Sequence, residues 1–225
     1  MEVVQPGVVF NVQAVQAVIF DMDGVLIDSE PLHFIVLNEV LARGGHALSG
    51  DEYEAFIGTT TEAMWSVLVQ RFRLPASAAD YIEQYNRALL RALEQPHPPQ
   101  PGVLRLLRWL RERGIRLGVA SSSPRSWIDA TLRSIGLDGT FEAIVSGDDV
   151  TPGDGKPSPT IYRLAATRLS VRPSRCVAIE DSPNGVLSAR RAGMRVIGVR
   201  TPVTAHLPLP GAERIVESLC DLHLT

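Results

Sequence analysis

Hydrophobic runs that end in polar residues recur along this chain, and helical patterns separate most of them. The first run, "AVQAVIFD", covers residues 14–21 and ends in an acid. Four later runs, together with a weaker one, "ERIVES", near the end of the sequence, have the composition of buried parallel strands; they cover residues 115–121, 141–147, 175–181 and 195–200. The pattern therefore predicts a sheet built from strands that are far apart in the sequence.

Amphipathic helical patterns lie between the later runs. Residues 102–114 carry leucines at three-residue spacing with arginines between them and end in a glycine. Further helices are predicted at 126–136, 158–170 and 182–193, the last with Ser182 as N-cap and a proline in its first turn. Regular alternation of strand and helix predicts an α/β fold, a doubly wound, Rossmann-like parallel sheet with helices on both faces.

The interval between the first two runs breaks this alternation. It is mostly helical in pattern and ends in the Pro-rich stretch "PHPPQPG" at 96–102, which is typical of a stiff linker. Within it, Trp65, Leu68, Val69 and Phe72 follow helical spacing and are expected to form core between helices. We predict a core domain formed by residues 1–30 and 99–225, and an inserted α-helical domain formed by residues 31–98.

Composition limits the possible partners and compartments. The chain has 225 residues, 45% of them hydrophobic, and a formal charge of −3, which gives no reason to expect a nucleic-acid partner. No stretch reaches the about 18 uncharged apolar residues of a membrane span, and the apolar N-terminal segment lacks the basic region of a secretion signal. Cys176 and Cys220 have no metal-ligand spacing. We expect a cytoplasmic, monomeric protein without a membrane partner.

Carboxylates follow two of the predicted strands. Asp21 and Asp23 end the first run, and Glu180 and Asp181 end the run at 175–181. In a doubly wound sheet, ligands bind beyond the carboxyl ends of the strands where the strand order reverses, so neighbouring strands would bring these acids together. Oxygen ligands in a small volume suit a hard divalent cation, Mg²⁺ first among them. The alternative is that the acids are turn residues or helix caps.

Two further polar groups belong to the same predicted edge. Ser121 ends the run at 115–121 and leads into a helix, where hydroxyl and backbone N–H groups form an anion site; the alternative is that Ser121–Ser123 cap the helix. Lys156 is the one lysine among 22 basic residues. Its compact charge suits a place where a guanidinium does not fit, which favours a functional role.

Taken together, these residues resemble the haloacid dehalogenase superfamily, in the β-phosphoglucomutase- and phosphoglycolate phosphatase-like branch that has a helical cap domain after the first motif. Four motifs of that superfamily are present in order: "DMDGVLIDSE", "VASSS", "GKPSP" and "IEDSPNG". The resemblance implies that Asp21 is a nucleophile that forms an aspartyl-phosphate. It also implies that Asp23 protonates the leaving oxygen and later accepts a proton from water.

The resemblance further implies a binding role for the other motif residues. Mg²⁺ would be held by Asp21, Asp181 and the backbone carbonyl of Asp23, with Glu180 acting directly or through a water. Ser121, Ser122 and Lys156 would hold the transferring phosphoryl group. The superfamily's dehalogenases lack the second Asp and Mg²⁺, so the residue at position 23 argues against dehalogenation.

The expected function is therefore a Mg²⁺-dependent phosphatase for a small phosphorylated metabolite, such as a sugar phosphate, a polyol phosphate or phosphoglycolate. One alternative is a β-phosphoglucomutase-like isomerase, although the inserted domain has no lysine and has Thr61 or Glu62 where that relative has an arginine. A second alternative is a catalytically idle binding module. His33 could orient Asp23 or be structural, and Thr59–Thr61 could bind substrate or cap a helix.

Overall fold

The computed structural model describes residues 8–10, 14–57, 59–202 and 204–224. The chain divides into two compact units, one formed by Met1–Asp28 with His97–Thr225 and the other by Ser29–Pro96. We call these the core unit and the helical unit. Both boundaries predicted from the sequence, after residues 30 and 98, lie two residues further along the chain than the observed ones. Residues 1–7, which belong to the segment tested for a secretion signal, lie outside the described residues.

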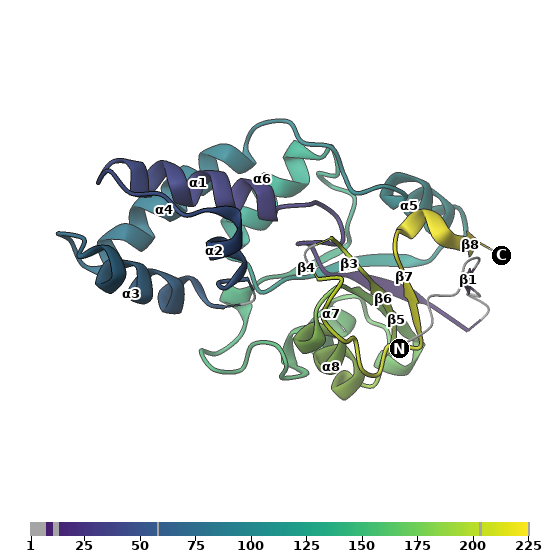
Figure 1. The fold of residues 1–225 in the computed structure, drawn as a ribbon. Helices are drawn as coiled ribbons and strands as arrows, with labels where there is room; N and C mark the ends of the chain where they lie inside the picture. The colour runs from purple at the N-terminus through teal and green to yellow at the C-terminus, as the bar shows by residue number, and fades with distance from the viewer. Residues whose placement is uncertain (1–7, 11–13, 58, 203, 225) are drawn as a thin grey trace. The chain divides into compact units, whose positions relative to one another are not determined.

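The core unit is built on a six-stranded parallel sheet with the strand order β4-β3-β2-β5-β6-β7 (Figure 1). The strands are β2 (Ala17–Phe20), β3 (Arg116–Ala120), β4 (Ala143–Val145), β5 (Cys176–Glu180), β6 (Arg195–Val199) and β7 (Arg214–Val216). The order reverses at β2, because β3 and β4 follow on one side and the later strands on the other. The predicted doubly wound α/β sheet is confirmed.

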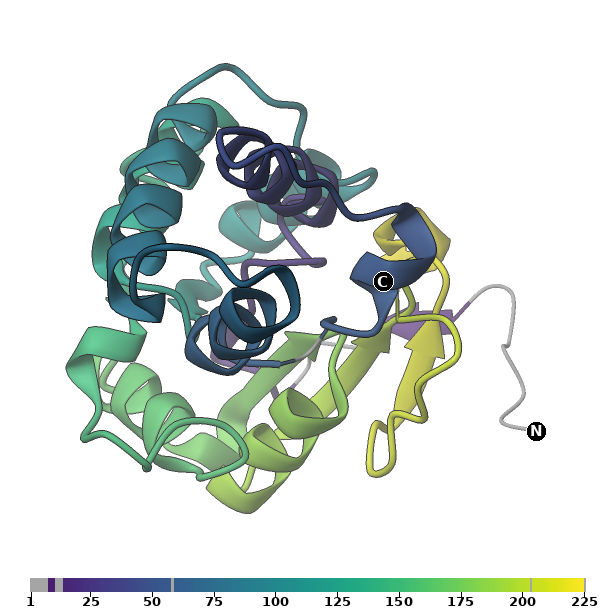
Figure 2. The same ribbon diagram turned by 60° about the vertical axis from the view of Figure 1, so that its left-hand side comes forward.

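Helices cover both faces of this sheet. They are α5 (Val103–Glu112), α6 (Arg125–Ser134), α7 (Thr160–Arg168) and α8 (Pro183–Ala192). Figures 1 and 2 show α7 and α8 on one face, with α5 on the other. Ile161 and Ala165 of α7 pack with Val186 of α8 in a core that also contains Ile19 and Ala178 of the central strands. Short 3₁₀ turns η1 (Gly147–Asp149), η2 (Pro173–Arg175) and η3 (Leu219–Asp221) connect the elements.

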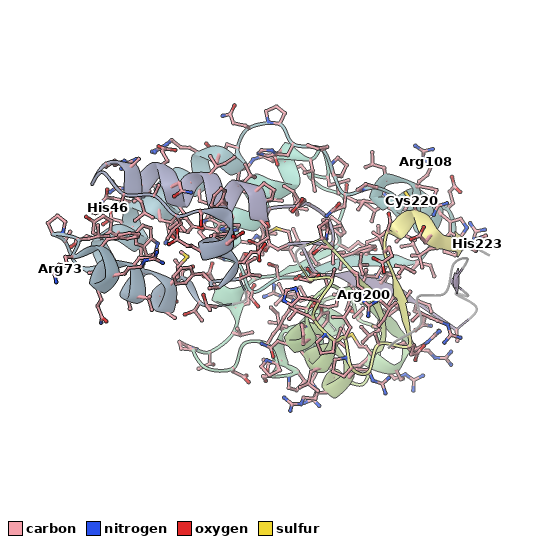
Figure 3. All side chains as sticks on the ribbon, viewed as in Figure 1. His46, Arg73, Arg108, Arg200, Cys220 and His223 are labelled. Carbon is pink, nitrogen blue, oxygen red and sulfur yellow. The ribbon has the colours of Figure 1, made fainter. Side chains whose placement is uncertain are left out.

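A second, two-stranded parallel sheet joins β1 (Val8–Phe10) to β8 (Leu222–Leu224). This sheet was not predicted, because strands of three residues are too short to show a periodic pattern in the sequence. Both cysteines are free: Cys176 is buried in β5, whereas Cys220 of η3 is exposed (Figure 3). Among the helices of the described residues, none combines the length and apolar character needed to span a membrane.

The helical unit contains α1 (Glu30–Ala42), α2 (Gly50–Glu54), α3 (Thr61–Phe72) and α4 (Ala78–Leu93). Ser49 and Ser77 form capping boxes that start α2 and α4. Trp65 and Leu68 are fully buried, which confirms their predicted place in the core of this unit; Val69 and Phe72 are half-buried. The Trp65 ring stacks on that of Tyr81 of α4, with the ring centroids 5.3 Å apart, so this pair joins α3 to α4.

Candidate active site

The loop after β2 folds back on itself immediately beyond the first two acids. Gly24 N–H donates to Ile27 O at 2.8 Å, and Leu26 N–H donates to Met22 O at 2.8 Å. Gly24 adopts a φ of 75°, which glycine reaches without steric cost. The tight turn buries the side chains of Met22, Leu26 and Ile27. The apolar side chains after Asp23 therefore face the inside of this turn, and Asp21 and Asp23 lie at the carboxyl edge of the sheet.

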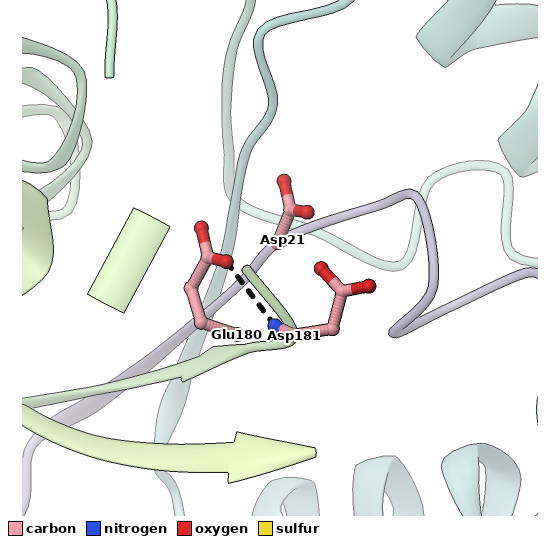
Figure 4. A group of neighbouring side chains, drawn as sticks. All are labelled: Asp21, Glu180 and Asp181. Carbon is pink, nitrogen blue, oxygen red and sulfur yellow. Dashed lines mark hydrogen bonds between the residues drawn. The ribbon is translucent and has the colours of Figure 1, made fainter. Parts of the chain in front are cut away.

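Three carboxylates meet at this edge, where β2 lies beside β5. Phe20 is in register with Ile179, so the next residues, Asp21 and Glu180, end adjacent strands at the same level. One carboxylate oxygen from each of Asp21, Glu180 and Asp181 lies within 4.8 Å of the others (Figure 4). All three residues are buried, with 7%, 0% and 8% of their surface exposed. The predicted convergence is thus present for Asp21, Glu180 and Asp181, whereas Asp23, the fourth acid of the prediction, is not in this group.

The single lysine lies within this cluster. Its Nζ donates to Asp21 Oδ1 at 2.7 Å and to Glu180 Oε1 at 2.6 Å, and its side chain is only 8% exposed. The loop that carries Lys156 is held by α8: Ser188 Oγ donates to Ser158 O, and an Arg191 guanidinium N–H donates to Pro157 O. The ammonium therefore has a fixed position between two acids that come from different strands.

Glu180 has hydrogen-bond partners on both carboxylate oxygens. Its Oε1 accepts from Lys156 and from the Tyr162 hydroxyl at 2.8 Å. Its Oε2 accepts from the backbone N–H groups of Asp181 and Ser182, both at 3.2 Å, and from Ser182 Oγ at 3.0 Å. The carboxylate lies against Gly185, where an added Cβ would approach Oε1 to 1.8 Å. This arrangement favours an orienting role, with any metal contact through a water.

Burial dominates the protonation of the acids. It raises the pKa of Asp21 to about 7, against the lowering effect of the neighbouring Lys156 ammonium. Burial and the charges of Asp21 and Glu180 raise the pKa of Asp181 well above its usual range. Burial alone would lower the pKa of Lys156, but the charges of Asp21 and Glu180 outweigh it and raise that pKa. The lysine is thus held in its charged form.

The donor set fits a divalent cation of the magnesium type. When all three carboxyl groups are ionised, they carry three negative charges and the Lys156 ammonium offsets one, so a buried excess of negative charge would need a cation. All the candidate ligands are oxygens, which hard cations prefer. Room for the cluster depends on Gly24, where a Cβ would lie 2.1 Å from Asp181 Oδ2. Asp21 and Asp181 are the side chains best able to contact such an ion.

The serines after β3 lie at the same edge. Ser121 is buried, its N–H donates to Val145 O, and its Oγ accepts from Ser123 N–H at 3.1 Å. Ser122 is exposed, and Ser123 Oγ donates to Asp23 Oδ2 at 2.9 Å. Helix α6 begins after Pro124 without a side-chain cap from these serines, so the capping alternative is wrong. Binding of a phosphoryl group by Ser121 and Ser122 stays a prediction.

The other predicted residues belong to the helical unit. His33 Nδ1 and the Tyr85 hydroxyl share a hydrogen bond of 2.5 Å. Thr60 caps α3 by accepting from Ala63 N–H, and Thr59 Oγ1 donates to Phe56 O. Thr61 is the first residue of α3. The capping interpretation therefore holds for Thr60, while contacts of these residues with a substrate stay predictions.

Three residues of the site were not assigned a role there by the sequence analysis. Tyr162 and Ser182 hydrogen-bond to Glu180, and Ser123 hydrogen-bonds to Asp23. Ser182 was expected as the N-cap of α8, and it also accepts from Gly185 N–H at 3.0 Å in that role. The run of three serines gave a hint of Ser123, whereas an aromatic residue in the first turn of an amphipathic helix is indistinguishable from ordinary core.

Known proteins resemble this chain over most of its length. The haloacid dehalogenase-like hydrolase family model matches residues 15–193. Phosphorylated carbohydrates phosphatase of Thermotoga maritima is 34% identical over 185 residues, which cover 82% of this chain and 85% of that protein. Hexitol phosphatase B of Escherichia coli K12 is 34% identical over 196 residues, which cover 85% of this chain and 86% of that protein.

A solved structure shows the same fold. The crystal structure of a CbbY mutant from Rhodobacter sphaeroides, in complex with xylulose-(1,5)bisphosphate, matches with a TM-score of 0.82 and 30% sequence identity. The match covers 93% of this chain and 97% of that chain. The family resemblance that the four motifs carry is therefore confirmed over nearly the whole sequence.

Proposed function

The chain belongs to the haloacid dehalogenase-like hydrolases and is a phosphoric monoester hydrolase, and from that premise we propose that it hydrolyses a small phosphorylated metabolite through an aspartyl-phosphate on Asp21. The observation that carries the proposal is the Lys156 ammonium, held between Asp21 and Glu180 at the switch point of the sheet. Ligands of doubly wound sheets bind at this place.

In the first half-reaction, a carboxylate oxygen of Asp21 attacks phosphorus, and the bond from phosphorus to the substrate's ester oxygen breaks. Asp23 gives its proton to that oxygen, so the alcohol leaves neutral. Lys156 and Ser121 bind the phosphoryl oxygens and offset the charge that develops on them. Positioning and charge neutralisation supply most of the rate in phosphoryl transfer.

In the second half-reaction, water attacks the same phosphorus. Asp23, now a carboxylate, accepts the proton of that water, and the bond from phosphorus to Asp21 breaks. Inorganic phosphate leaves, and both acids return to their starting protonation states. The hydrogen bond from Ser123 to Asp23 supports this alternation by holding the carboxyl group in place.

We propose Mg²⁺ as the cofactor, held by Asp21, Asp181 and the backbone carbonyl of Asp23. When bound, it supplies positive charge that neutralises the phosphoryl oxygens and aligns them with the nucleophile. Glu180 would contact it through a water, because both of its oxygens already accept hydrogen bonds. These residues provide the oxygen-only donor set that this cation prefers.

We propose a sugar phosphate, a polyol phosphate or phosphoglycolate as the substrate. Two of the relatives are named phosphorylated carbohydrates phosphatase and hexitol phosphatase B. These names support a sugar phosphate or a polyol phosphate as the substrate. The helical unit would act as a cap that excludes bulk water and selects the substrate, with His33 and Thr59–Thr61 as its candidate contacts. The monomeric state and the cytoplasmic location stay predictions.

The test is release of inorganic phosphate by the purified full chain from a panel of these metabolites in the presence of Mg²⁺. We expect turnover of at least one class, loss of turnover with EDTA, and recovery when Mg²⁺ is added back. Asp21→Asn should abolish turnover. Asp138→Asn, which changes an exposed acid of the core unit, should leave turnover unchanged and serves as the matched control.

Three outcomes would contradict the proposal. A fully active Asp21→Asn protein would exclude the nucleophile, and absence of phosphate release from every metabolite would favour the binding module. The third outcome comes from incubation with β-glucose 1-phosphate and a trace of bisphosphate primer. If glucose 6-phosphate accumulates in place of free phosphate, the protein is a mutase.

A further inference from the structure

Tyr162 is a polar residue in the middle of an apolar core. It lies on α7, is fully buried, and belongs to the cluster that also contains Ile161, Ala165 and Val186. Burying a hydroxyl without a partner is costly, so core positions of this kind favour phenylalanine unless the hydroxyl is used. Here the hydroxyl donates to Glu180 Oε1 at 2.8 Å.

The ring of Tyr162 is also next to the lysine of the site. Lys156 Nζ lies 5.3 Å from the centroid of that ring, and the same Nζ donates to Glu180 Oε1 at 2.6 Å. Tyr162 therefore contacts the pair in two ways: its hydroxyl meets the carboxylate that binds the ammonium, and its ring meets the ammonium itself. A cation over an aromatic ring is stabilised when both are shielded from water.

We propose that Tyr162 is a positioning residue that acts through Glu180 to fix the ammonium of Lys156 beside the Asp21 nucleophile. Glu180 is held by donors on both of its oxygens, and Tyr162 is the donor on Oε1 besides the lysine. Without the hydroxyl, Oε1 of Glu180 keeps Lys156 as its one side-chain donor among the described residues, so the carboxylate and the ammonium bound to it are held less firmly. The role rests on the proposed function, because it concerns the lysine that holds the phosphoryl group.

The chain offers a sharp test because Lys156 is its one lysine. Lysine-selective ¹⁵N labelling gives one side-chain ammonium signal, and this signal is seen when hydrogen bonds slow the exchange of its protons with water. We expect the full chain to show it, with and without Mg²⁺. Tyr162→Phe keeps the ring and its packing, so the variant should fold. In this variant, the Lys156 ammonium signal should shift or become too broad to detect.

Tyr53→Phe is the matched control. Tyr53 also donates a hydroxyl hydrogen bond to a glutamate, Glu30 Oε2 at 2.7 Å, but both residues lie in the helical unit. This variant should leave the Lys156 signal unchanged. In turnover, Tyr162→Phe should lower kcat about tenfold while KM stays within about twofold, the size expected for one hydrogen bond to a charged group.

A double-mutant cycle shows whether Tyr162 acts through Glu180. Glu180→Gln keeps the shape of the side chain and removes its charge. In that background, Tyr162→Phe should change kcat less than about twofold, because the charged carboxylate that connects Tyr162 to Lys156 is already absent. A full tenfold effect in the Glu180→Gln background would overturn the proposal.

The inference and the proposed function fail in distinguishable ways. A wild-type protein without phosphate release would refute the function, while the effect of Tyr162→Phe on the ammonium signal could still be observed. A wild-type phosphatase in which Tyr162→Phe leaves both the ammonium signal and kcat unchanged would refute the inference alone. A Tyr162→Phe protein with a normal signal but a much lower melting temperature would assign the tyrosine to the core.

Discussion

Ser123 Oγ donates a hydrogen bond of 2.9 Å to Asp23 Oδ2, although the two residues are 100 positions apart in the chain. They meet because each follows one of two adjacent strands, Asp23 the central strand β2 and Ser123 its neighbour β3. A hydrogen bond to one oxygen of a carboxyl group restricts its rotation. The serine therefore holds the proposed proton donor in one orientation.

We predict that Ser123→Ala lowers kcat about fivefold and changes KM little, because loss of one neutral hydrogen bond to an ionisable group is of this size. Ser123→Thr keeps a hydroxyl and should retain most of the activity. Ser134→Ala, which removes a hydroxyl that donates to Thr131 O elsewhere in the core unit, is the control and should have wild-type kinetics. Steady-state phosphate release measures all three, and equal losses in the Ala and Thr variants would contradict the orienting role.

The two proposed roles of the first acids can be separated chemically. Asp23→Asn retains the nucleophile but cannot exchange a proton, so we predict slow formation of the phosphoenzyme and slower hydrolysis of it. Mass spectrometry after acid quench should find a phosphoryl group on a peptide that contains Asp21. Asp21→Asn gives the matched negative result. Phosphoenzyme on the Asp21→Asn protein would mean that another residue is the nucleophile.

The meeting of residues at one edge of the sheet could be predicted from the sequence, because it depends on strand order. Asp21 and Asp181 end hydrophobic runs, and a doubly wound sheet brings the ends of such runs to one edge. Lys156 was selected because it is the one lysine among 22 basic residues and lies at the same predicted edge of the sheet. These inferences succeed because they need only the order of the elements and not the rotamer of any side chain.

Hydrogen bonds between side chains could not be predicted from the sequence. Tyr162 has the spacing of a core residue in α7, and only the three-dimensional structure shows that its hydroxyl reaches Glu180. Glu180 was expected to act on a metal directly or through a water, and the choice between these depends on donors supplied by four other residues. Such contacts depend on the exact positions of side-chain atoms, which a periodic pattern in the sequence does not encode.

Gly24 makes the cluster of Asp21, Glu180 and Asp181 sensitive to one added methyl group. A Cβ at this position would lie 2.1 Å from Asp181 Oδ2, so Gly24→Ala must displace that carboxylate. We predict that Mg²⁺ binding, measured by calorimetry without substrate, weakens about 10- to 100-fold, the range for disturbed support of a metal ligand. Gly139→Ala shares the positive φ, 66° against 75°, but its Cβ would meet nothing within 4 Å. Equal weakening in both variants would assign the effect to backbone strain.

Asp149 links pH to the stability of the core unit. Its Oδ1 accepts from Arg168 at 2.5 Å and its Oδ2 from Ser146 N–H at 2.8 Å. These bonds, that from Arg168 above all, hold the Asp149 pKa below its ordinary value of 3.8. Because the folded pKa is lowered, this contribution is complete above the ordinary pKa and is lost as the pH falls toward the folded value. We predict that Asp149→Asn lowers the free energy of unfolding by about 1 kcal/mol at pH 7, and that the difference from wild type narrows below pH of about 4.

Denaturant titrations at several pH values measure this free energy for both proteins. Glu83→Gln, which breaks an exposed pair with Arg87, is the control; a difference for Asp149→Asn that stays constant down to pH of about 3 would exclude the carboxylate's charge as its cause.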